Sequence, residues 1–473
     1  MGTESEGVQM TDACAVILAA GDGKRMKSAQ PKVLCEVLFK PMIAWVVDSV
    51  DRCGVPHTCV VVNDSGKVEP VLPARVKTAV QLERRGTGHA TKMAAGFIRE
   101  CGAADVMVLC GDAPLVTGED LAKAYALHKA EKNDVTVLSA VVDNSTGYGR
   151  IVREDGHARR EDGQVTAIVE EADTDETTRL IPEINSGAFW FGAKFLLEAL
   201  DKLQPNNAQG EYYLTDTLAY AVNHGYRAGA CVVSPDAALG ANSRKGLQQL
   251  NAIARERVLE KHLENGVDIP FADGIVIGVD VKIGPDTRIL PGTILKGNTV
   301  IGAGCEIGPN SHITDGVVKD GSQIISSYID SAVVEANVKI GPMSNIRPDS
   351  HIMDGVKIGD FVEIKNSTIG EKTSVAHLTY VGDSDVGKGC NFGCGVVTVN
   401  YDGTNKHRTV IGDHAFIGCN TNLVAPVRVG NHAYSAAGTT ITEDVPDDAL
   451  VIGRARQVVK EGWTVKTGKF RKK

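Results

Sequence analysis

A glycine-rich loop near the start of the chain gathers residue types suited to binding phosphates. Gly21–Met26 follows directly on an apolar run, residues 14–20, and includes Lys24 and Arg25. Lys32 comes seven residues after Arg25. Backbone N–H groups and cations in such a loop suit a polyphosphate. The loop fits neither the GxGxxG pattern of dinucleotide-binding proteins nor the P-loop pattern, so a plain turn with solvated charges stays open.

Two further sets of residue types suit chemistry. Asp112 follows a second apolar run, at the end of a predicted strand where ligands sit in such sheets, although it could simply cap a turn. In the second half of the chain, His377 has the residue type of a general base that can titrate near neutral pH. Arg347 and Lys365 suit a phosphate. By residue type alone, however, such a histidine is more often structural, and the two cations could be solvated charges.

A six-residue period organises the second half and would position these residues. Such a period fits neither a helix nor a half-buried strand. It is typical of a solenoid with short flat faces joined by turns, whereas an ordinary antiparallel β-domain is the alternative. Polar residues gather where the period breaks, at 376–380 and 399–406, which predicts a site there. The aliphatic residues in phase are Ile277, Ile283, Ile289, Leu295, Ile301, Ile307, Ile313, then Val334, Ile340, Ile346, Ile352, Ile358, Ile364, then Ile411, Ile417, Leu423 and Val429.

In the first half, apolar runs alternate with amphipathic stretches. This alternation predicts an α/β doubly wound sheet, in which ligands sit outside the carboxyl ends of the strands. The glycine-rich loop and Asp112 both fall there. We expect strands at 14–20, 58–62 and 106–110, and helices at 41–53 and 88–100.

A long amphipathic helix is predicted at residues 243–266, ending at a glycine. The chain should therefore have three parts, an α/β domain at 1–240, a linker helix at 241–266 and a solenoid with a C-terminal tail at 267–473.

Composition narrows the class of protein. A chain of 473 residues exceeds a single core, and its net charge of −9 argues against nucleic acid as the main partner. No apolar run approaches the ~20 residues of a membrane span, and we expect no signal peptide. The eleven cysteines include no CxxC pair, so we expect reduced thiols in a cytoplasmic protein.

A series of motifs places the chain near a known family. They are Leu18-Ala19-Ala20-Gly21-x-Gly-x-Arg25-Met26, Pro31-Lys32, Gln81, Gly86-Thr87-Gly88-His89-Ala90, Gly111-Asp112, Thr146-Gly147-Tyr148-Gly149-Arg150, Val169-Glu170, Glu183-Ile184-Asn185-Ser186-Gly187 and Gln209-Gly210-Glu211-Tyr212-Tyr213-x-Thr215-Asp216. In this order they resemble the sugar-nucleotide pyrophosphorylases. With the solenoid behind them, residues 15 to 463 resemble the bacterial bifunctional UDP-N-acetylglucosamine pyrophosphorylase / glucosamine-1-phosphate N-acetyltransferase family.

The resemblance implies a Rossmann-like nucleotidyltransferase domain followed by a left-handed parallel β-helix. It implies that UTP and N-acetylglucosamine 1-phosphate react with release of pyrophosphate, with Mg²⁺ held by Asp112 and Asn242 and with Arg25 and Lys32 as catalytic cations. The resemblance also implies that the product supplies peptidoglycan and lipopolysaccharide synthesis. The residues implied for binding UTP and UDP-N-acetylglucosamine are Leu18, Ala19, Ala20, Gly21, Lys32, Gln81, Gly86, Thr87, Gly149, Glu170, Asn185, Thr215 and Asn242.

For the solenoid, the resemblance implies acetylation of glucosamine 1-phosphate by acetyl-CoA as co-substrate, with His377 as base, in a homotrimer. Glu363 could orient His377. Arg347, Lys365, Tyr380 and Asn391 would bind glucosamine 1-phosphate, and Lys406 would hold its ring or amine. Cys394, Asn400, Tyr401, Cys419, Ala437 and Arg454 would bind acetyl-CoA. Three positions depart from the family, which usually has Thr at Lys24, Ala at Cys394 and Ser at Cys419.

Two other functions are compatible with parts of this pattern. One is a single-activity pyrophosphorylase whose solenoid only oligomerises or regulates. The other is a non-enzymatic scaffold. His377, Lys365 and the stretch Asn400–Lys406 argue against the first, because a structural solenoid does not need them, and Arg25, Lys32, Asp112 and Asn242 argue against the second.

Overall fold

The computed structural model describes residues 10–21, 23, 26–154 and 164–469. Its contacts divide the chain into two compact units, one that ends at Glu256 and one that begins at Arg257. The three-part division drawn from the sequence stays a prediction.

The first unit is built on a mixed β-sheet. Its main path runs β11-β7-β10-β6-β1-β4-β5, and β8 and β9 extend it. Strand β1 is parallel to β4 and β6, whereas β10 is antiparallel to β6 and β7. The strands are β1 (Ala13–Leu18), β4 (His57–Val62), β5 (Lys77–Val80), β6 (Asp105–Cys110), β7 (Val135–Val141), β8 (Arg150–Arg153), β9 (Val165–Val169), β10 (Glu183–Gly192) and β11 (Ala228–Val232), with a separate hairpin of β2 (Glu36–Val37) and β3 (Lys40–Pro41).

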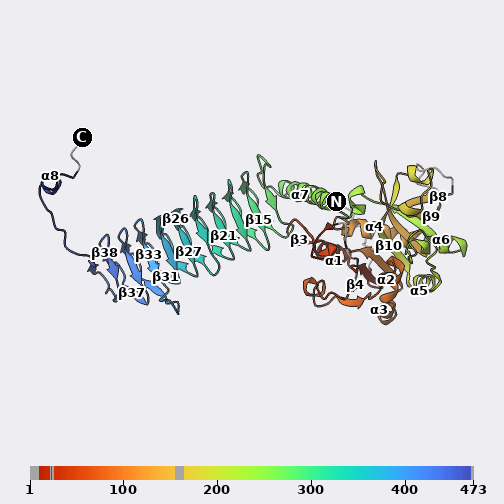
Figure 1. The fold of residues 1–473 in the computed structure, drawn as a ribbon, viewed down its shortest axis with the longest axis horizontal. Coiled ribbons are helices and arrows are strands. Elements are labelled where there is room, and N and C mark those ends of the chain that lie inside the picture. Colours follow the sequence, from red (N-terminus) through yellow and green to blue (C-terminus); the bar gives the residue numbers. More distant parts are fainter. Residues whose placement is uncertain (1–9, 22, 24–25, 155–163, 470–473) are drawn as a thin grey trace, which may run out of the picture. The chain divides into compact units, whose positions relative to one another are not determined.

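Helices cover both faces of this sheet, as a doubly wound α/β domain requires (Figure 1). Residues of α1 (Met42–Cys53) and α4 (Gly118–Ala130) pack into the core on one face. The other face packs against α2 (Thr87–Met93), α3 (Ala95–Cys101), α5 (Ala193–Lys202) and α6 (Asp216–Asn223). Short 3-10 turns are η2 (Lys32–Leu34), η3 (Glu69–Val71), η4 (Glu171–Asp173), η5 (Thr178–Leu180) and η6 (Pro235–Ala238). The predicted α/β class and the three predicted strands are confirmed.

The single helix predicted at residues 88–100 is wrong, because the segment forms two helices. The chain breaks at Ala94, whose φ of −85° and ψ of 2° lie outside the α-helical region. Ala94 is fully buried, and Gly96, a weak helix former, follows it. The amphipathic pattern continues through the break because both helices cover the same face of the sheet.

The predicted connecting helix is confirmed as α7 (Arg244–Glu264). It ends at Glu264, two residues before Gly266, which has a φ of +83°, a conformation in which glycine is favoured after a helix.

The second unit is the predicted left-handed parallel β-helix of hexapeptide repeats (Figure 1). Short strands fall in turn on three parallel sheets, named here after their first strands. The β12 sheet contains β12 (Val276–Ile277), β15 (Ile294–Lys296), β18 (His312–Thr314), β21 (Tyr328–Asp330), β24 (Asn345–Ile346), β27 (Glu363–Lys365), β30 (Tyr380–Gly382), β33 (Val397–Val399), β36 (Asn422–Val424) and β39 (Thr440–Ile441). The β13 sheet contains β13 (Lys282–Ile283), β16 (Val300–Ile301), β19 (Val317–Val318), β22 (Val333–Val334), β25 (His351–Ile352), β28 (Thr368–Ile369), β31 (Ser384–Val386), β34 (Thr409–Ile411) and β37 (Val427–Val429). The β14 sheet contains β14 (Arg288–Ile289), β17 (Glu306–Ile307), β20 (Gln323–Ile324), β23 (Lys339–Ile340), β26 (Lys357–Asp360), β29 (Ser374–His377), β32 (Asn391–Phe392), β35 (Phe416–Ile417), β38 (Tyr434–Ser435) and β40 (Leu450–Val451); a short helix, α8 (Trp463–Thr467), follows.

The aliphatic period marks the inside of the β-helix. Every residue of the three predicted blocks is buried except Ile283, which is partly exposed. Between the blocks the coils continue with shorter turns, since Val318 and Ile329 point inward only five residues after the preceding inward residue. The one long insertion lies between the inward residues Thr398 and Ile411. The apparent breaks in the period are therefore changes in turn length.

Among the described residues, no helix is long and apolar enough to cross a membrane.

Replacing one inward aliphatic residue should destabilise the β-helix. Ile352 is fully buried on β25, away from the polar stretches, and Ile352→Ala should cost about 2–5 kcal/mol by leaving a cavity. The exposed Lys339→Ala on β23 is the matched control and should change the denaturation midpoint little. The midpoint is followed by loss of acetyltransferase activity. Equal midpoints for the two variants would contradict the inward placement of Ile352.

Candidate functional sites

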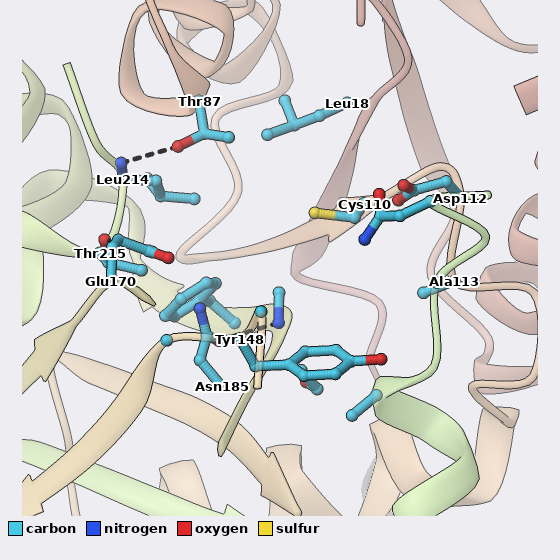
Figure 2. A pocket seen from close by; sticks show the side chains of 18 residues that line it. Leu18, Thr87, Cys110, Asp112, Ala113, Tyr148, Glu170, Asn185, Leu214 and Thr215 are labelled. Carbon is cyan, nitrogen blue, oxygen red and sulfur yellow. Dashed lines mark hydrogen bonds between the residues drawn. The ribbon is translucent and has the colours of Figure 1, made fainter. Parts of the chain in front are cut away.

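Two adjoining hollows lie at the carboxyl ends of β1 and β6 in the first unit, where a doubly wound sheet binds ligands. The larger, of about 570 Å³, is lined by the glycine-rich loop, Lys32 and the segment around Gln81. The smaller, of about 200 Å³, is lined by Tyr148, Asn185 and their neighbours (Figure 2). Residues that line both hollows are Leu18, Thr87, Cys110, Asp112 and Asn242. Because they share these residues, the two hollows can hold two substrates that react with each other.

Three predicted residues meet between these hollows. The ammonium of Lys32 forms an ion pair with Asp112 Oδ2 and donates a hydrogen bond of 2.6 Å to Asn242 Oδ1. Lys32 begins η2, Asp112 follows β6, and Asn242 precedes α7. Thus two oxygens from distant parts of the chain converge on one cation.

The segment from Gln81 to Thr87, whose residues the resemblance implies for binding UTP, is held in an ordered turn. The Gln81 side chain donates to the Gly86 carbonyl at 3.2 Å and is 3.0 Å from His89 Nδ1. Gly86 has a φ of +101°, and an added Cβ there would lie 2.6 Å from the Tyr212 carbonyl oxygen. Only glycine fits so close to this backbone. Thr87 Oγ1 accepts from Leu214 N at 3.0 Å, which ties this segment to the one that carries Thr215 (Figure 2).

Four residues of the set implied for UDP-N-acetylglucosamine come together around the smaller hollow, namely Gly149, Glu170, Asn185 and Thr215. Thr215 Oγ1 donates to Glu170 Oε1 at 3.0 Å, and Asn185 N donates to the Gly149 carbonyl at 2.9 Å. An added Cβ at Gly149 would lie 3.2 Å from Glu170 Oε2, so glycine lets the carboxylate approach this turn. Burial raises the pKa of Glu170, an effect that the hydrogen bond from Thr215 partly offsets.

The sequence did not single out two residues that the structure places in the smaller hollow. Cys110 ends β6, and its sulfur points into the hollow (Figure 2). Burial raises the pKa of its thiol to about 12, so the group is neutral. Tyr148 lies on the opposite side, between two glycines of a motif already quoted. The signal for Cys110 was its place at the carboxyl end of a strand, directly before Gly111-Asp112.

Two sequence predictions in this unit have a different outcome. Arg25 and its neighbour Lys24 lie outside the described residues. Ala19 is 1 % exposed and packs into the core beneath the sheet instead of lining a hollow, although Leu18, Ala20 and Gly21 line the larger one. Alternation along the strand turns the Ala19 side chain away from its neighbours.

In the second unit, a line of residues follows the corner between the β14 and β12 sheets. Asp360, His377, Cys394, Cys419 and Ala437 each come two residues after the inward residue of a β14-sheet strand, and these strands are consecutive in that sheet. We call these five residues the corner row. Arg454 comes one residue after the equivalent position on β40, and its Cδ lies 3.6 Å from the Cβ position of Gly438, next to Ala437. The histidine predicted as base and most residues predicted to bind acetyl-CoA therefore share one line.

The carboxylate that contacts His377 is Asp360, so the expectation that Glu363 orients this histidine is wrong. His377 Nδ1 lies 3.0 Å from Asp360 Oδ1, and the two residues are in register on β26 and β29. The hydrogen bond to His377 lowers the pKa of Asp360. Glu363 lies beyond the corner on β27 and pairs instead with Arg347, at 2.7 Å.

The predicted glucosamine-phosphate residues divide between two faces. Lys365 and Tyr380 lie on adjacent strands of the β12 sheet, and Arg347 follows β24 of the same sheet. The Tyr380 hydroxyl lies over Gly382, where a Cβ would collide with it. Asn391, by contrast, is exposed on β32 of the β14 sheet.

The long insertion after β33 is anchored beside these residues. Asn400 is buried and donates to Asp383 Oδ2, and its side chain is 3.4 Å from the Tyr380 hydroxyl. At the end of the insertion, Arg408 pairs with both oxygens of Asp385, at 2.5 and 2.6 Å. Lys365 lowers the pKa of Lys406, so two ammonium groups approach each other here. Such a pair suits a phosphate dianion. Tyr401 is exposed.

Comparison with known proteins matches both units. The MobA-like NTP transferase domain matches residues 15–184, and the bacterial transferase hexapeptide family matches residues 280–315 and 331–366. Proteins named "Bifunctional protein GlmU" match almost the whole chain. That of Clostridium acetobutylicum is 47% identical and covers 96% of this chain and 99% of its own, and that of Caldanaerobacter subterraneus subsp. tengcongensis is 50% identical over 96% and 98%. A third, from Acetivibrio thermocellus, is 45% identical and covers 97% of this chain and 98% of its own.

The chain belongs to the GlmU family. It is a bifunctional enzyme of UDP-N-acetylglucosamine synthesis, which acetylates glucosamine 1-phosphate with acetyl-CoA and transfers UMP from UTP to N-acetylglucosamine 1-phosphate. Membership over the full length favours this function over a single-activity pyrophosphorylase and over a non-enzymatic scaffold.

The raised pKa of Glu170 predicts how sugar binding depends on pH. Protonation removes an acceptor for sugar hydroxyls, so KM for N-acetylglucosamine 1-phosphate should fall as pH rises from 4.5 through the raised pKa, then level off. Glu170→Gln should raise this KM about 10-fold to 100-fold at neutral pH and weaken its dependence on pH. Uridylyltransferase kinetics across pH measure both effects. A Gln variant with the parent's full pH dependence would contradict this role.

The two carboxylates at the corner should have separable effects on acetyl transfer. Asp360→Asn should lower kcat about 10-fold to 100-fold, because it leaves the His377 ring misdirected. Glu363→Gln should mainly raise KM for glucosamine 1-phosphate, because Arg347 loses the carboxylate that holds its guanidinium in place. Steady-state kinetics of both variants provide the test. An equal fall in kcat in both would restore Glu363 as the orienting group.

Proposed function

We propose that the two activities occupy two separate sites, the paired hollows of the first unit and the corner of the β-helix. The observation that carries this proposal is the corner row, which aligns His377 with residues assigned to acetyl-CoA, remote in sequence from the convergence of Lys32, Asp112 and Asn242.

The uridylyltransferase site would work mainly by positioning and charge neutralisation. The phosphate of N-acetylglucosamine 1-phosphate is already a nucleophile, so its attack on the α-phosphate of UTP needs no side-chain base. The larger hollow would hold UTP, and Gln81 and Gly86 would contact its uracil base. The smaller hollow would hold the sugar, with Glu170 and Asn185 as hydrogen-bonding partners. Lys32 and Arg25 would neutralise the phosphates and the leaving pyrophosphate.

We propose Mg²⁺ as the metal of this site, held by Asp112 and Asn242. Their oxygens already converge on one cation, the Lys32 ammonium, which supports their fit to a metal ion. Among the described residues, no group of three or more His, Cys, Asp or Glu could hold a metal. Two oxygen ligands nevertheless suit Mg²⁺, which takes its remaining ligands from phosphate and water. When bound, Mg²⁺ would neutralise charge on the phosphates.

The acetyltransferase site would use His377 to take a proton from the amine of glucosamine 1-phosphate as that amine attacks the thioester. Asp360 is a positioning residue, which holds the imidazole through Nδ1 and leaves Nε2 to face the amine. Arg347 and Lys365 would bind the phosphate, and Tyr380 would contact the ring. Lys406, which the resemblance places at the ring or the amine, approaches Lys365 and is proposed here to contact the phosphate as well. Asn391, on the neighbouring face, is proposed to contact the same substrate at the corner.

Acetyl-CoA would lie along the corner row with its thioester at His377. From His377 the row passes Cys394, Cys419 and Ala437 and reaches Arg454, whose charge suits the phosphates of CoA. Four strand spacings of about 4.8 Å make this path about 19 Å long, which suits an extended chain. Asn400 and Tyr401, in the long insertion, are proposed to complete the site.

We further propose a homotrimer in the cytoplasm that supplies the precursor of peptidoglycan and lipopolysaccharide. His377 is 59 % exposed and Asp360 is 42 % exposed, so the corner row of one protomer is an open strip. A neighbouring copy in a closed cyclic oligomer would provide its second wall.

Separate sites predict opposite effects of two variants. His377→Ala should lower acetyl transfer by about 10²-fold to 10⁴-fold and leave uridylyl transfer within about twofold. Asp112→Ala should lower uridylyl transfer by about 10³-fold and spare acetyl transfer. Each activity is assayed alone, by release of CoA thiol or of pyrophosphate. Loss of both activities in either folded variant would refute separate sites.

A further inference from the structure

Two of the eleven cysteines stand in the corner row, where acetyl-CoA is proposed to lie. Cys394 and Cys419 occupy equivalent positions in consecutive coils of the β14 sheet. The Asn420 N–H donates to the Cys394 carbonyl at 2.8 Å, which confirms that the two turns stack. Consecutive strands of a sheet are about 4.8 Å apart, so each thiol lies one coil from the next member of the row.

These two thiols are accessible, whereas most of the others are not. Cys419 is exposed and Cys394 is partly exposed, while seven of the eleven cysteines are buried. The Cys419 sulfur lies against the turn that carries Cys394, because an added Cβ at Gly393 would be 2.8 Å from it. Cys390, only four residues before Cys394, is 2 % exposed, and burial raises the pKa of its thiol. The thiolate is the reacting form, so Cys390 is a poor nucleophile.

The position of His377 indicates which thiol would meet the sulfur of CoA. Acetyl transfer requires the thioester carbon to be beside the amine that His377 deprotonates. Cys394 is one coil from His377, whereas Cys419 is two coils away. The sulfur of a bound CoA derivative therefore lies beside Cys394, and the rest of that molecule extends past Cys419 toward Arg454.

We propose that Cys394 is a modification site, which forms a mixed disulfide with CoA delivered by a CoA-type disulfide bound along the corner row. The inference rests on the proposed position of acetyl-CoA. The modified site cannot bind acetyl-CoA, so acetyl transfer stops while uridylyl transfer continues.

The exchange is balanced without a further oxidant. The Cys394 thiol loses its proton to solvent, and the thiolate attacks the CoA sulfur of a disulfide CoA–S–S–R. A bond forms between Cys394 Sγ and the CoA sulfur as the original S–S bond breaks. The other half leaves as the thiolate RS⁻ and takes up a proton. A thiol reductant reverses the exchange by the same chemistry.

The test exposes the full-length protein to CoA disulfide, with glutathione disulfide at the same concentration in parallel. Peptide mapping by mass spectrometry locates the adduct, and both activities are measured relative to the untreated sample. We expect one CoA adduct on Cys394 and none on the buried Cys390. Acetyl transfer should fall at least about tenfold, uridylyl transfer should change less than twofold, and a reductant should restore the loss. Modification should be at least about tenfold faster with CoA disulfide than with glutathione disulfide, and saturating acetyl-CoA should slow it.

Two variants, and an assay of acetyl transfer by the untreated protein, distinguish failure of this inference from failure of the proposed function. Cys394→Ala should lose the adduct and the sensitivity, whereas Cys101→Ser, with a partly exposed thiol in the first unit, should keep both. Each variant is compared with its own untreated activity. If untreated protein shows no acetyl transfer, the proposed function fails. If acetyl transfer is present but CoA attaches only elsewhere, or glutathione disulfide reacts as fast, or Cys394 and Cys419 join without retaining CoA, this inference alone is overturned.

Discussion

Parallel stacking of coils in register is the constraint on which the second unit depends. One inward residue per strand, most often Ile or Val, packs against its equivalents in the coils before and after it. Because each strand is held by its neighbours, residues at the same offset from the inward position line up along the corners. Asp360 reaches His377 in this way, and Cys394, Cys419 and Ala437 continue the line. A line of side chains long enough to contact an extended ligand thus arises from repetition.

The first unit reaches a site by convergence instead of repetition. Parallel strands β1 and β6 end at the same edge, where the glycine-rich loop and Asp112 follow them. Lys32 pairs with Asp112 and with Asn242, which lies 210 residues after Lys32 in the chain. Antiparallel strand β10 brings Asn185 to the same edge and creates the smaller hollow beside the larger one. The two units therefore illustrate two ways in which secondary structure collects polar groups.

Much of this architecture could be predicted from the sequence, because the physical signals are local. The aliphatic period predicted the inward face, and apolar runs predicted β1, β4 and β6. Contacts that depend on turn length could not be predicted. Asp360 and His377 are in register although 17 residues separate them, and Glu363, 14 residues from His377, lies around the corner. Where two inward residues are five residues apart instead of six, the number of residues between equivalent positions of neighbouring coils changes, and the sequence gives no clear signal of this. The break at Ala94 was hidden because both helices bury the same face.

The central claim is that His377 marks the thioester end of a CoA site that runs along the corner row. A crystal structure of the full-length protein with CoA bound would test this claim most directly. Our account predicts the CoA sulfur beside His377 and Cys394, the chain passing Cys419 and Ala437, and the phosphates near Arg454. A CoA molecule bound in the reverse direction, or on a face of the β-helix that excludes His377, would contradict it.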